Sequence, residues 1–276
     1  MGGVLYIVAT PIGNLEDITL RALRVLKEVN LIAAEDTRHT RILLNHYSIL
    51  TATTSYHEHN ERTKAPVLVE RLINGENVAL VTDAGTPTLS DPGCRLIQQA
   101  TGAGIPVVPV PGVSALTAVL SASGFFAGRF VFEGFLPSKR AERLERLEVL
   151  REETRTLVFY EAPHRLTESL EDLLKVLGDR EVVLGREVTK LYEEFIRGRL
   201  SEVLSQLLHK EIRGELTLVV QGGEKKELPS GDLLRKEIQK LRREGFRVKE
   251  IAQLLGEKFS CSRKEIYRLA LEGNKK

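Results

Sequence analysis

The chain has 276 residues, of which 42% are hydrophobic and 28% are charged. This length allows two domains and a small appendage, and the composition excludes collagen-like, low-complexity and wholly disordered classes. The formal net charge of +2 is unevenly spread, because residues 1–223 carry 25 basic and 29 acidic side chains, whereas residues 224–276 carry 15 and nine. Affinity for phosphate groups is therefore expected mainly in the C-terminal segment.

The first half of the chain alternates between short apolar runs and amphipathic segments. The apolar runs predict buried strands at 4–9, 31–34, 78–81 and 107–110. The segments between them carry apolar residues at helical spacing and predict helices near 15–29, 40–46 and 60–73. Strands that are apolar on both faces are typical of parallel sheets covered by helices, so we expect an α/β domain over residues 1–120.

The alternation restarts after residue 120. Further strands are predicted at 129–135, 156–160, 181–185, 193–198 and 215–221. Helices are predicted near 139–152, 163–176 and 201–209. These elements indicate a second α/β domain over residues 121–222.

The last part of the chain has a different pattern. Residues 222–230 are polar and predict a linker, and three helical patterns follow at 233–243, 248–255 and 262–271. The turn at 256–261 resembles a helix-turn-helix connection, and Ser262-x-x-Glu265 is a capping box at the start of the last helix. We expect a basic, helix-turn-helix-like tail over residues 223–276.

Location and redox chemistry follow from what the sequence lacks. No stretch approaches about 18 uncharged apolar residues, and the first residues carry no basic segment before a long apolar one, so we expect a soluble cytoplasmic protein. Cys94 and Cys261 lie far apart and in no C-x-x-C spacing, and both are expected to be free thiols.

Three loops stand at the ends of predicted strands and share glycine, proline and small polar residues: 10–14, 83–87 and 111–115. Ligands of open parallel sheets bind at the carboxyl ends of strands, and such loops let the backbone approach a ligand closely. One such loop is weak evidence, because ordinary turn chemistry explains it equally well, whereas three favour a nucleotide-like or sulfonium ligand. After the second loop, Ser90 or Asp91 is expected to cap the next helix, with Pro92 at its first position.

Other motifs allow a functional and a structural interpretation. The turn at 35–38, which carries two acidic residues and one basic residue, fits either a substrate site or a helix start capped by Thr37. Residues 160–165 fit either a functional site or a helix start with Pro163 at its first position. His57 and His59 without further ligands are more typical of a loop than of a metal site. The sequence has no Walker-type phosphate loop, and the glycines at 102–104 follow a helix and indicate its end.

Together these motifs resemble the ribosomal RNA small-subunit methyltransferase I family of the tetrapyrrole-methylase superfamily. The motifs are VATPIGNLED (8–17), AEDTR (34–38), DAGTP (83–87) with SDPG (90–93), PG (111–112) with SA (114–115), and FYEAPHR (159–165). The resemblance runs through essentially the whole chain, and the first and last motifs are specific to the RNA branch.

The resemblance implies a two-domain α/β fold of the tetrapyrrole-methylase (class III methyltransferase) type with a small C-terminal helical extension, commonly as a homodimer. It implies transfer of a methyl group from S-adenosylmethionine to the ribose 2′-hydroxyl of a cytidine in the decoding region of small-subunit (16S) rRNA. By similarity, the cofactor lies between the domains and is lined by Pro11, Asp83, Thr86, Ser114, Ala115, Tyr160, Glu161, Leu216 and Thr217.

Methyl transfer from a sulfonium is an in-line displacement that needs positioning and no metal. A base and a cation that stabilises the alkoxide should help, and Glu35 and Lys190 are the candidates. The candidate nucleotide-binding residues are Asn14, Asp36, Arg38 and Arg186, with Lys139 and Arg140 as phosphate contacts or simply solvated charges. The basic tail is a candidate clamp for rRNA or the small ribosomal subunit.

Two alternatives remain open from the sequence. A small-molecule tetrapyrrole methylase would keep its activity without residues 224–276, but such relatives usually carry a glycine-rich loop ending in Pro-Gly where this chain has residues 10–14. A nucleic-acid-binding regulator would use the tail to bind duplexes and would transfer no methyl group.

Overall fold

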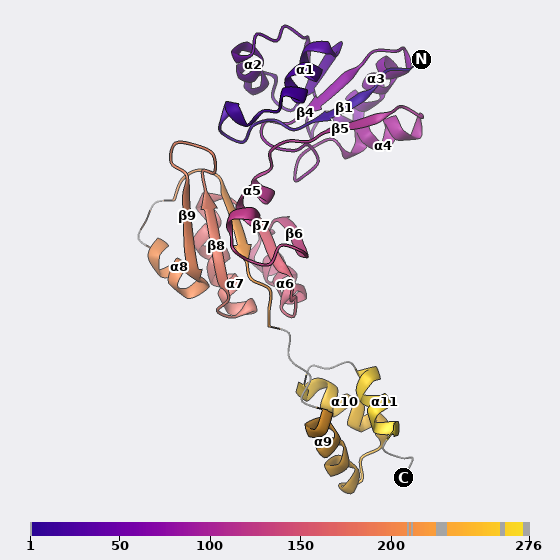
Figure 1. The fold of residues 1–276 in the computed structure, drawn as a ribbon, viewed down its shortest axis with the longest axis vertical. Helices are drawn as coiled ribbons and strands as arrows, with labels where there is room; N and C mark the ends of the chain where they lie inside the picture. Colours follow the sequence, from indigo (N-terminus) through magenta and orange to yellow (C-terminus); the bar gives the residue numbers. More distant parts are fainter. Residues whose placement is uncertain (1, 209, 211, 225–230, 260–262, 273–276) are drawn as a thin grey trace. The chain divides into compact units, whose positions relative to one another are not determined.

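The structure, a computed structural model, describes residues 2–208, 210, 212–224, 231–259 and 263–272. The chain divides into two compact units, Met1–Gly223 and Glu224–Lys276 (Figure 1). Over these residues, the first unit contains two five-stranded sheets, and the second contains three helices. Each unit is described by itself.

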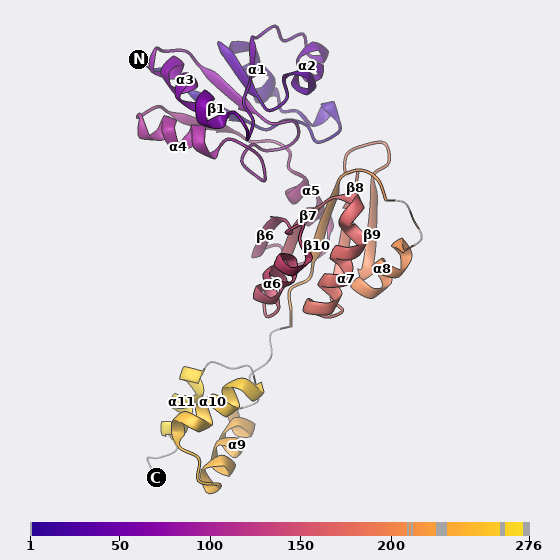
Figure 2. The same cartoon turned by 180° about the vertical axis from the view of Figure 1, so that it is seen from behind.

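The first sheet is entirely parallel. Its strands are β1 (Leu5–Val8), β2 (Leu31–Ala34), β3 (Thr53–Ser55), β4 (Val78–Val81) and β5 (Val107–Val110), in the order β3-β2-β4-β1-β5. One face packs against α1 (Leu20–Glu28) and α2 (Thr37–His46), and the other against α3 (Glu61–Ile73) and α4 (Cys94–Gly102) (Figure 2). Coverage on both faces explains why β2 and β4 are buried at every residue.

The second sheet is mixed. Its strands are β6 (Phe130–Phe135), β7 (Thr156–Glu161), β8 (Glu181–Arg186), β9 (Glu194–Arg199) and β10 (Leu216–Val220), in the order β6-β7-β10-β8-β9, with only the β6–β7 pair parallel. One face carries α6 (Arg140–Leu150), α7 (Leu166–Leu177) and α8 (Leu200–Leu207).

Helix α5 (Ala115–Ala122) joins the two sheets. It follows β5 of the first sheet, but Leu116, Val119 and Leu120 pack on Val158, Val183 and Val219 of the second. The boundary expected between residues 120 and 121 therefore lies inside a helix that belongs by its packing to the second sheet.

Several predicted helix starts are wrong. The helix expected near 15–29 is split into the 3-10 turn η1 (Leu15–Asp17) and α1, because the Thr19 hydroxyl accepts a hydrogen bond from the Ala22 N–H and starts α1 there. Neither Ser90 nor Asp91 caps α4, which begins at Cys94 after Gly93, with a φ of +141°. Asp36, not Thr37, caps α2.

The second unit is a small three-helix bundle of α9 (Gly231–Arg243), α10 (Val248–Phe259) and α11 (Arg263–Glu272). Its core is formed by Leu234, Ile238, Ile251, Ala252, Leu255, Ile266 and Ala270. The predicted capping residue Ser262 and Cys261 lie outside the described residues, whereas Cys94 is exposed and free. Among the described residues, no helix combines the length and apolar character needed to cross a membrane.

Candidate functional site

The three glycine- and proline-containing loops meet at the carboxyl end of the first sheet. Thr10 and Gly85 exchange backbone hydrogen bonds of 2.9 and 3.0 Å, which join the loops after β1 and β4. The Thr86 hydroxyl donates to the Val113 carbonyl at 3.1 Å and joins the loops after β4 and β5. Residues that are distant in sequence therefore form one continuous surface at this edge, as expected for a parallel sheet.

A cavity of about 380 Å³, which we call the interdomain pocket, lies between these loops and strands β7 and β10 of the second sheet. Its lining residues are Ile12, Ala84, Gly85, Thr86, Leu89, Ser90, Asp91, Ser114, Ala115, Phe135, Tyr160, Glu161, Ala162, Pro163, Gly214, Glu215, Leu216 and Thr217. Seven of the nine residues proposed for the cofactor lie on it: Thr86, Ser114, Ala115, Tyr160, Glu161, Leu216 and Thr217. Its volume falls in the range of small-ligand sites.

The donor set of this pocket fits S-adenosylmethionine. Helix α5 begins at the pocket. The Ser114 side chain does not cap it, and its Leu116 N–H donates to the Tyr160 hydroxyl at 3.3 Å, so the positive end of the helix faces a site suited to a carboxylate. Asp91, Glu161 and Glu215 bring carboxyl groups that suit a sulfonium cation. Apolar side chains such as Phe135 and Leu216 suit an adenine ring.

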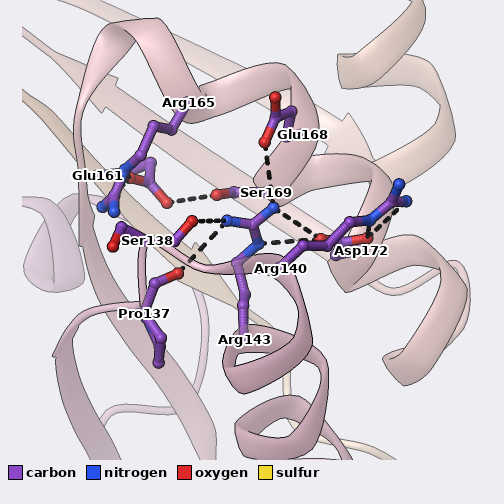
Figure 3. A network of polar contacts seen from close by, with 9 residues as sticks. All are labelled: Pro137, Ser138, Arg140, Arg143, Glu161, Arg165, Glu168, Ser169 and Asp172. Carbon is purple, nitrogen blue, oxygen red and sulfur yellow. Dashed lines mark hydrogen bonds and ion pairs between the residues drawn. The ribbon is translucent and has the colours of Figure 1, made fainter.

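Glu161 is fixed by a hydrogen-bond network behind the pocket (Figure 3). One carboxylate oxygen accepts from the Arg165 guanidinium at 2.7 Å and from the Ala162 N–H at 2.8 Å. The other accepts from the Ser169 hydroxyl at 2.5 Å. Because Glu161 is only 2% exposed, these partners satisfy a charge that would otherwise be buried without compensation.

Pro11 and Asp83, the other two proposed cofactor residues, line a second cavity of about 250 Å³. We call it the α2 pocket, and its lining residues are Thr10, Pro11, Gly13, Leu15, His39, Thr40, Ile42, Leu43, Thr82 and Asp83. Neighbouring residues of one loop therefore face different cavities, since Ile12 lines the interdomain pocket.

Three carboxyl groups near the cavities interact: Asp83 lines the α2 pocket, Asp91 lines the interdomain pocket, and Glu35 lines neither. Glu35, at the end of β2, accepts a hydrogen bond from the Asp83 N–H at 3.4 Å, and the Asp83 carboxylate accepts one from the Asp36 N–H at 3.0 Å. Burial raises the pKa of Glu35, and this effect outweighs the hydrogen bond from the Asp83 N–H, which lowers the pKa. Burial and then the charge of Glu35 raise the pKa of Asp91 to about 7. Such shifts are typical of functional sites.

We expect Asp91→Asn to raise Tm at pH 8 and to leave it nearly unchanged at pH 3.5. A carboxyl whose pKa is higher in the folded than in the unfolded chain stabilises the fold at pH values below its ordinary pKa of 3.8. That contribution is lost as the pH rises towards the folded-state pKa of about 7. Each kcal/mol recovered at pH 8 should raise Tm by about 2–4 °C. Thermal unfolding across this pH range measures the effect.

Asp179→Asn is the control of opposite sign. Hydrogen bonds from the Ser201 N–H and hydroxyl lower the pKa of Asp179, so its contribution is present above the ordinary pKa and is lost in acid. This variant should lower Tm at pH 8. An Asp91→Asn variant that also loses stability at pH 8 would contradict the assignment of a destabilising carboxylate.

Lys190 connects the two cavities. Its aliphatic stem lies against Gly13 of the α2 pocket, where an added Cβ would come within 2.3 Å of Cγ. Its Nζ forms ion pairs with Glu187 at 2.9 Å and with Glu215 of the interdomain pocket at 3.3 Å. Burial alone lowers the pKa of Lys190, but these two carboxylates outweigh it and raise the pKa, so the ammonium stays charged.

Glu35 and Lys190 are not among the lining residues of either cavity, and the remaining candidate residues line neither cavity as well. Asn14 caps η1, and Asp36 pairs with the exposed Arg38 at 2.8 Å. Hydrogen bonds from Arg38 hold the pKa of Asp36 far below its usual range. Arg186 pairs with Glu194. Both basic residues at the start of α6 have acidic partners, Lys139 with Glu142 and Arg140 with Asp172.

The sequence analysis did not assign Asp91, Glu215, Thr40 or Thr82 to a site. Asp91 was interpreted as a helix cap, and only Glu215 had a signal, its position next to Leu216 and Thr217. The rings of His57 and His59 lie 6.0 Å apart. Within the described ranges, no group of three or more potential metal ligands comes together.

Known methyltransferases are similar to this chain in sequence. The profile of the tetrapyrrole (corrin/porphyrin) methylases matches residues 4–204. Proteins named ribosomal RNA small subunit methyltransferase I are similar: that of Pseudomonas aeruginosa is 53% identical over 80% of this chain and 79% of its own, and that of Escherichia coli O157:H7 is 47% identical over 98% and 95%.

Solved structures share the fold at lower identity. Uroporphyrin-III C-methyl transferase from Thermus thermophilus complexed with S-adenyl homocysteine has a TM-score of 0.56, with 22% identity over 79% of this chain and 97% of that one. The methyltransferase CobJ has a TM-score of 0.62, with 19% identity over 82% and 97%. At these identities the likeness extends to the fold alone.

Proposed function

Because this chain belongs to the tetrapyrrole methylase family, and within it to the ribosomal RNA small subunit methyltransferase I group, we propose that it methylates small-subunit rRNA. The methyl group comes from S-adenosylmethionine, and the acceptor is the ribose 2′-hydroxyl of a cytidine in the decoding region. The observation that carries the proposal is the interdomain pocket, whose lining combines the N-terminus of α5, three carboxyl groups and apolar side chains.

The residues of the interdomain pocket hold the methyl donor. The first turn of α5 binds the carboxylate of the methionine moiety, and Asp91 and Glu215 supply negative charge on the pocket for the sulfonium. When bound, S-adenosylmethionine supplies an electrophilic methyl group. The hydrogen bonds that fix Glu161 keep this wall of the pocket rigid, which favours a single orientation of the donor.

Two side chains between the cavities act on the acceptor. Glu35 takes the proton of the ribose hydroxyl, and its raised pKa makes it a better base than an ordinary carboxylate. The ammonium of Lys190 stabilises the alkoxide that forms, and its two ion pairs keep it charged and in place.

The second unit supplies a basic surface for RNA. Lys236, Lys240 and Arg243 lie three and four residues apart on α9 and line one shallow hollow. Such a row fits the spacing of backbone phosphates. We propose that it contacts rRNA, within a small ribosomal subunit or free, and that the protein acts in the cytoplasm as a homodimer.

The two alternatives are less well supported. The relatives that match about 98% of this chain, its helical extension included, carry rRNA methyltransferase names, whereas the porphyrin and CobJ methyltransferases share only the fold. The duplex-binding regulator alternative gives no role to the interdomain pocket. Transfer of a methyl group to RNA is therefore the activity to test.

The test is transfer of tritium from labelled S-adenosylmethionine to small ribosomal subunits that lack their own ribose methylation. We expect label in the RNA, and inhibition by S-adenosylhomocysteine. Ala115→Phe, which places a ring at the start of α5 in the interdomain pocket, should abolish transfer, whereas Thr101→Val on the exposed side of α4 should not. Label in a tetrapyrrole, or none in RNA while the cofactor binds, would contradict the proposal.

Neutralising the basic row on α9 gives a separate prediction. The triple variant Lys236→Ala, Lys240→Ala, Arg243→Ala should weaken binding to small subunits and flatten its salt dependence. Each lost phosphate contact reduces the slope of log K against log salt by about 0.7–0.9. Binding measured at several salt concentrations checks this, and an unchanged slope would exclude α9 from the RNA contact.

A further inference from the structure

The α2 pocket is placed to receive part of the acceptor. In two loops, neighbouring residues line different cavities. Pro11 and Gly13 line the α2 pocket, whereas Ile12 between them lines the interdomain pocket. Likewise, Asp83 lines the α2 pocket and Ala84 lines the interdomain pocket. A group in the α2 pocket and the methyl donor in the interdomain pocket would thus be separated only by these loops.

The α2 pocket contains a buried hydroxyl that no protein group satisfies. Thr40 is 4% exposed, and its Oγ1 has no hydrogen-bond partner in the structure. Thr82 is 1% exposed, and its hydroxyl also makes no hydrogen bond of regular geometry, although the Asp91 carboxyl is near it. Buried polar groups are rarely left unpaired, so the Thr40 hydroxyl, in a residue of the lining, is a candidate partner for a polar ligand.

The charge of the lining disfavours a phosphate as that ligand. Among the described residues, no lysine or arginine lines the α2 pocket, and Asp83 contributes a carboxylate. One oxygen of that carboxylate accepts from the Asp36 N–H at 3.0 Å, which fixes its orientation. A carboxylate disfavours anions and attracts N–H donors, which favours a ligand that carries an amino group.

The composition of the lining suits a ring with a polar edge. Pro11, Leu15, Ile42 and Leu43 give apolar walls, and the polar groups of Thr40, Thr82 and Asp83 lie among them. At about 250 Å³ the pocket is smaller than the range typical of whole ligands, and it suits a single ring better than a nucleoside. Proteins bind unstacked RNA bases by this combination of apolar contact to the ring faces and hydrogen bonds to the edge.

We infer that the α2 pocket holds the base of the nucleotide that is methylated, and that it selects a pyrimidine with an exocyclic amino group. This inference rests on the proposed function. Asp83 accepts from the amino group, and the Thr40 hydroxyl donates to a ring acceptor. With the base there, the ribose lies towards Lys190 and Glu35. Lys190 contacts Gly13 of this pocket and pairs with Glu215 of the other, and Glu35 accepts from the Asp83 N–H. The nucleotide must leave the RNA stack to enter, as in other enzymes that modify nucleotides.

The decisive variant is Asp83→Asn. Asparagine keeps an oxygen for the Asp36 N–H and replaces the other carboxylate oxygen by an N–H₂ donor, which pairs with the carbonyl of uracil instead of the amino group of cytosine. The experiment measures kcat/KM of the full chain on unmethylated small subunits that carry either cytidine or uridine at the target position. We expect the preference of the wild type for cytidine to fall by at least about tenfold in Asp83→Asn.

Thr40→Val provides a second measurement that keeps the shape of the side chain. It should raise KM for cytidine-containing subunits by about three- to tenfold, the value of one hydrogen bond, and leave KM for S-adenosylmethionine unchanged. Thr101→Val on α4 is the matched control. An unchanged cytidine preference in a folded Asp83→Asn variant would overturn the inference. If Asp83→Asn does not fold, an unchanged KM of Thr40→Val for cytidine-containing subunits would overturn the inference.

The outcome also separates this inference from its premise. Wild-type protein that labels neither kind of subunit contradicts the proposed function, and the base pocket with it. Wild-type protein that labels RNA, with variants that keep its preference and its KM, contradicts the base pocket alone.

Discussion

Lys190→Met is expected to reduce methyl transfer by about 10²- to 10³-fold, the effect of removing one group that stabilises a developing oxyanion. The Lys190 stem lies against Gly13, and its ammonium pairs with Glu187 and Glu215, so the charge is held at the border of the two cavities. Methionine keeps most of the packing and removes the charge. Single-turnover methyl transfer measures the chemical step.

A structural role for Lys190 would give a different result. Removing the ammonium leaves Glu187 and Glu215 without their shared cation, so Tm and the Kd for S-adenosylhomocysteine must be measured with the rate. Lys190→Arg should restore part of the activity, because it keeps the charge. A Lys190→Met variant that retains its rate within about threefold would remove Lys190 from the mechanism.

Asp172→Leu is expected to lower the free energy of unfolding by about 3–5 kcal/mol, because it leaves a buried charge without its partner. Asp172 and Arg143 are both fully buried and join at 2.9 Å, and Arg143 also donates to the carbonyls of Pro137 and Ser138 (Figure 3). Arg140 pairs with the other oxygen of Asp172 at 3.0 Å. Urea unfolding measures the loss.

Glu168→Gln is the matched control in the same network. Its carboxylate also pairs with Arg143, at 3.2 Å, but its side chain is 68% exposed, so its loss should change stability by less than about 1 kcal/mol. Equal effects of the two substitutions would contradict the importance of burial. Since α7 also carries Ser169, which binds Glu161, Asp172→Leu should raise KM for S-adenosylmethionine as well.

The class of fold could be predicted from the sequence, and the comparisons confirm it. Apolar runs such as 78–81 are visible because strands covered on both faces need apolar residues at every position. Strand β3 was missed because its residues, Thr53–Ser55, are few and polar. The predicted start of α4 is wrong because the helix begins only after Gly93, which takes a φ of +141°. Asp91, one of the two expected caps, instead lines the interdomain pocket, and its pKa is raised.

The loops of the site could be predicted, but not the direction of each residue within them. Pro11 and Ile12 are neighbours in one motif and face different cavities, which depends on how the loop folds against Gly85. The α2 pocket had no signal, because Thr40 looks like an ordinary helix residue until its burial is known. Asp172 and Arg143 likewise resemble solvated helix charges, and only tertiary contacts show that they are buried.

Mapping the labelled nucleotide tests the central claim most directly. Small subunits labelled from tritiated S-adenosylmethionine would be digested with alkali, which cleaves RNA next to free 2′-hydroxyls and spares a bond next to a methylated one. The account predicts label in one alkali-stable dinucleotide that contains a cytidine of the decoding region. Label on a base, on a ribosomal protein or spread over many nucleotides would contradict it.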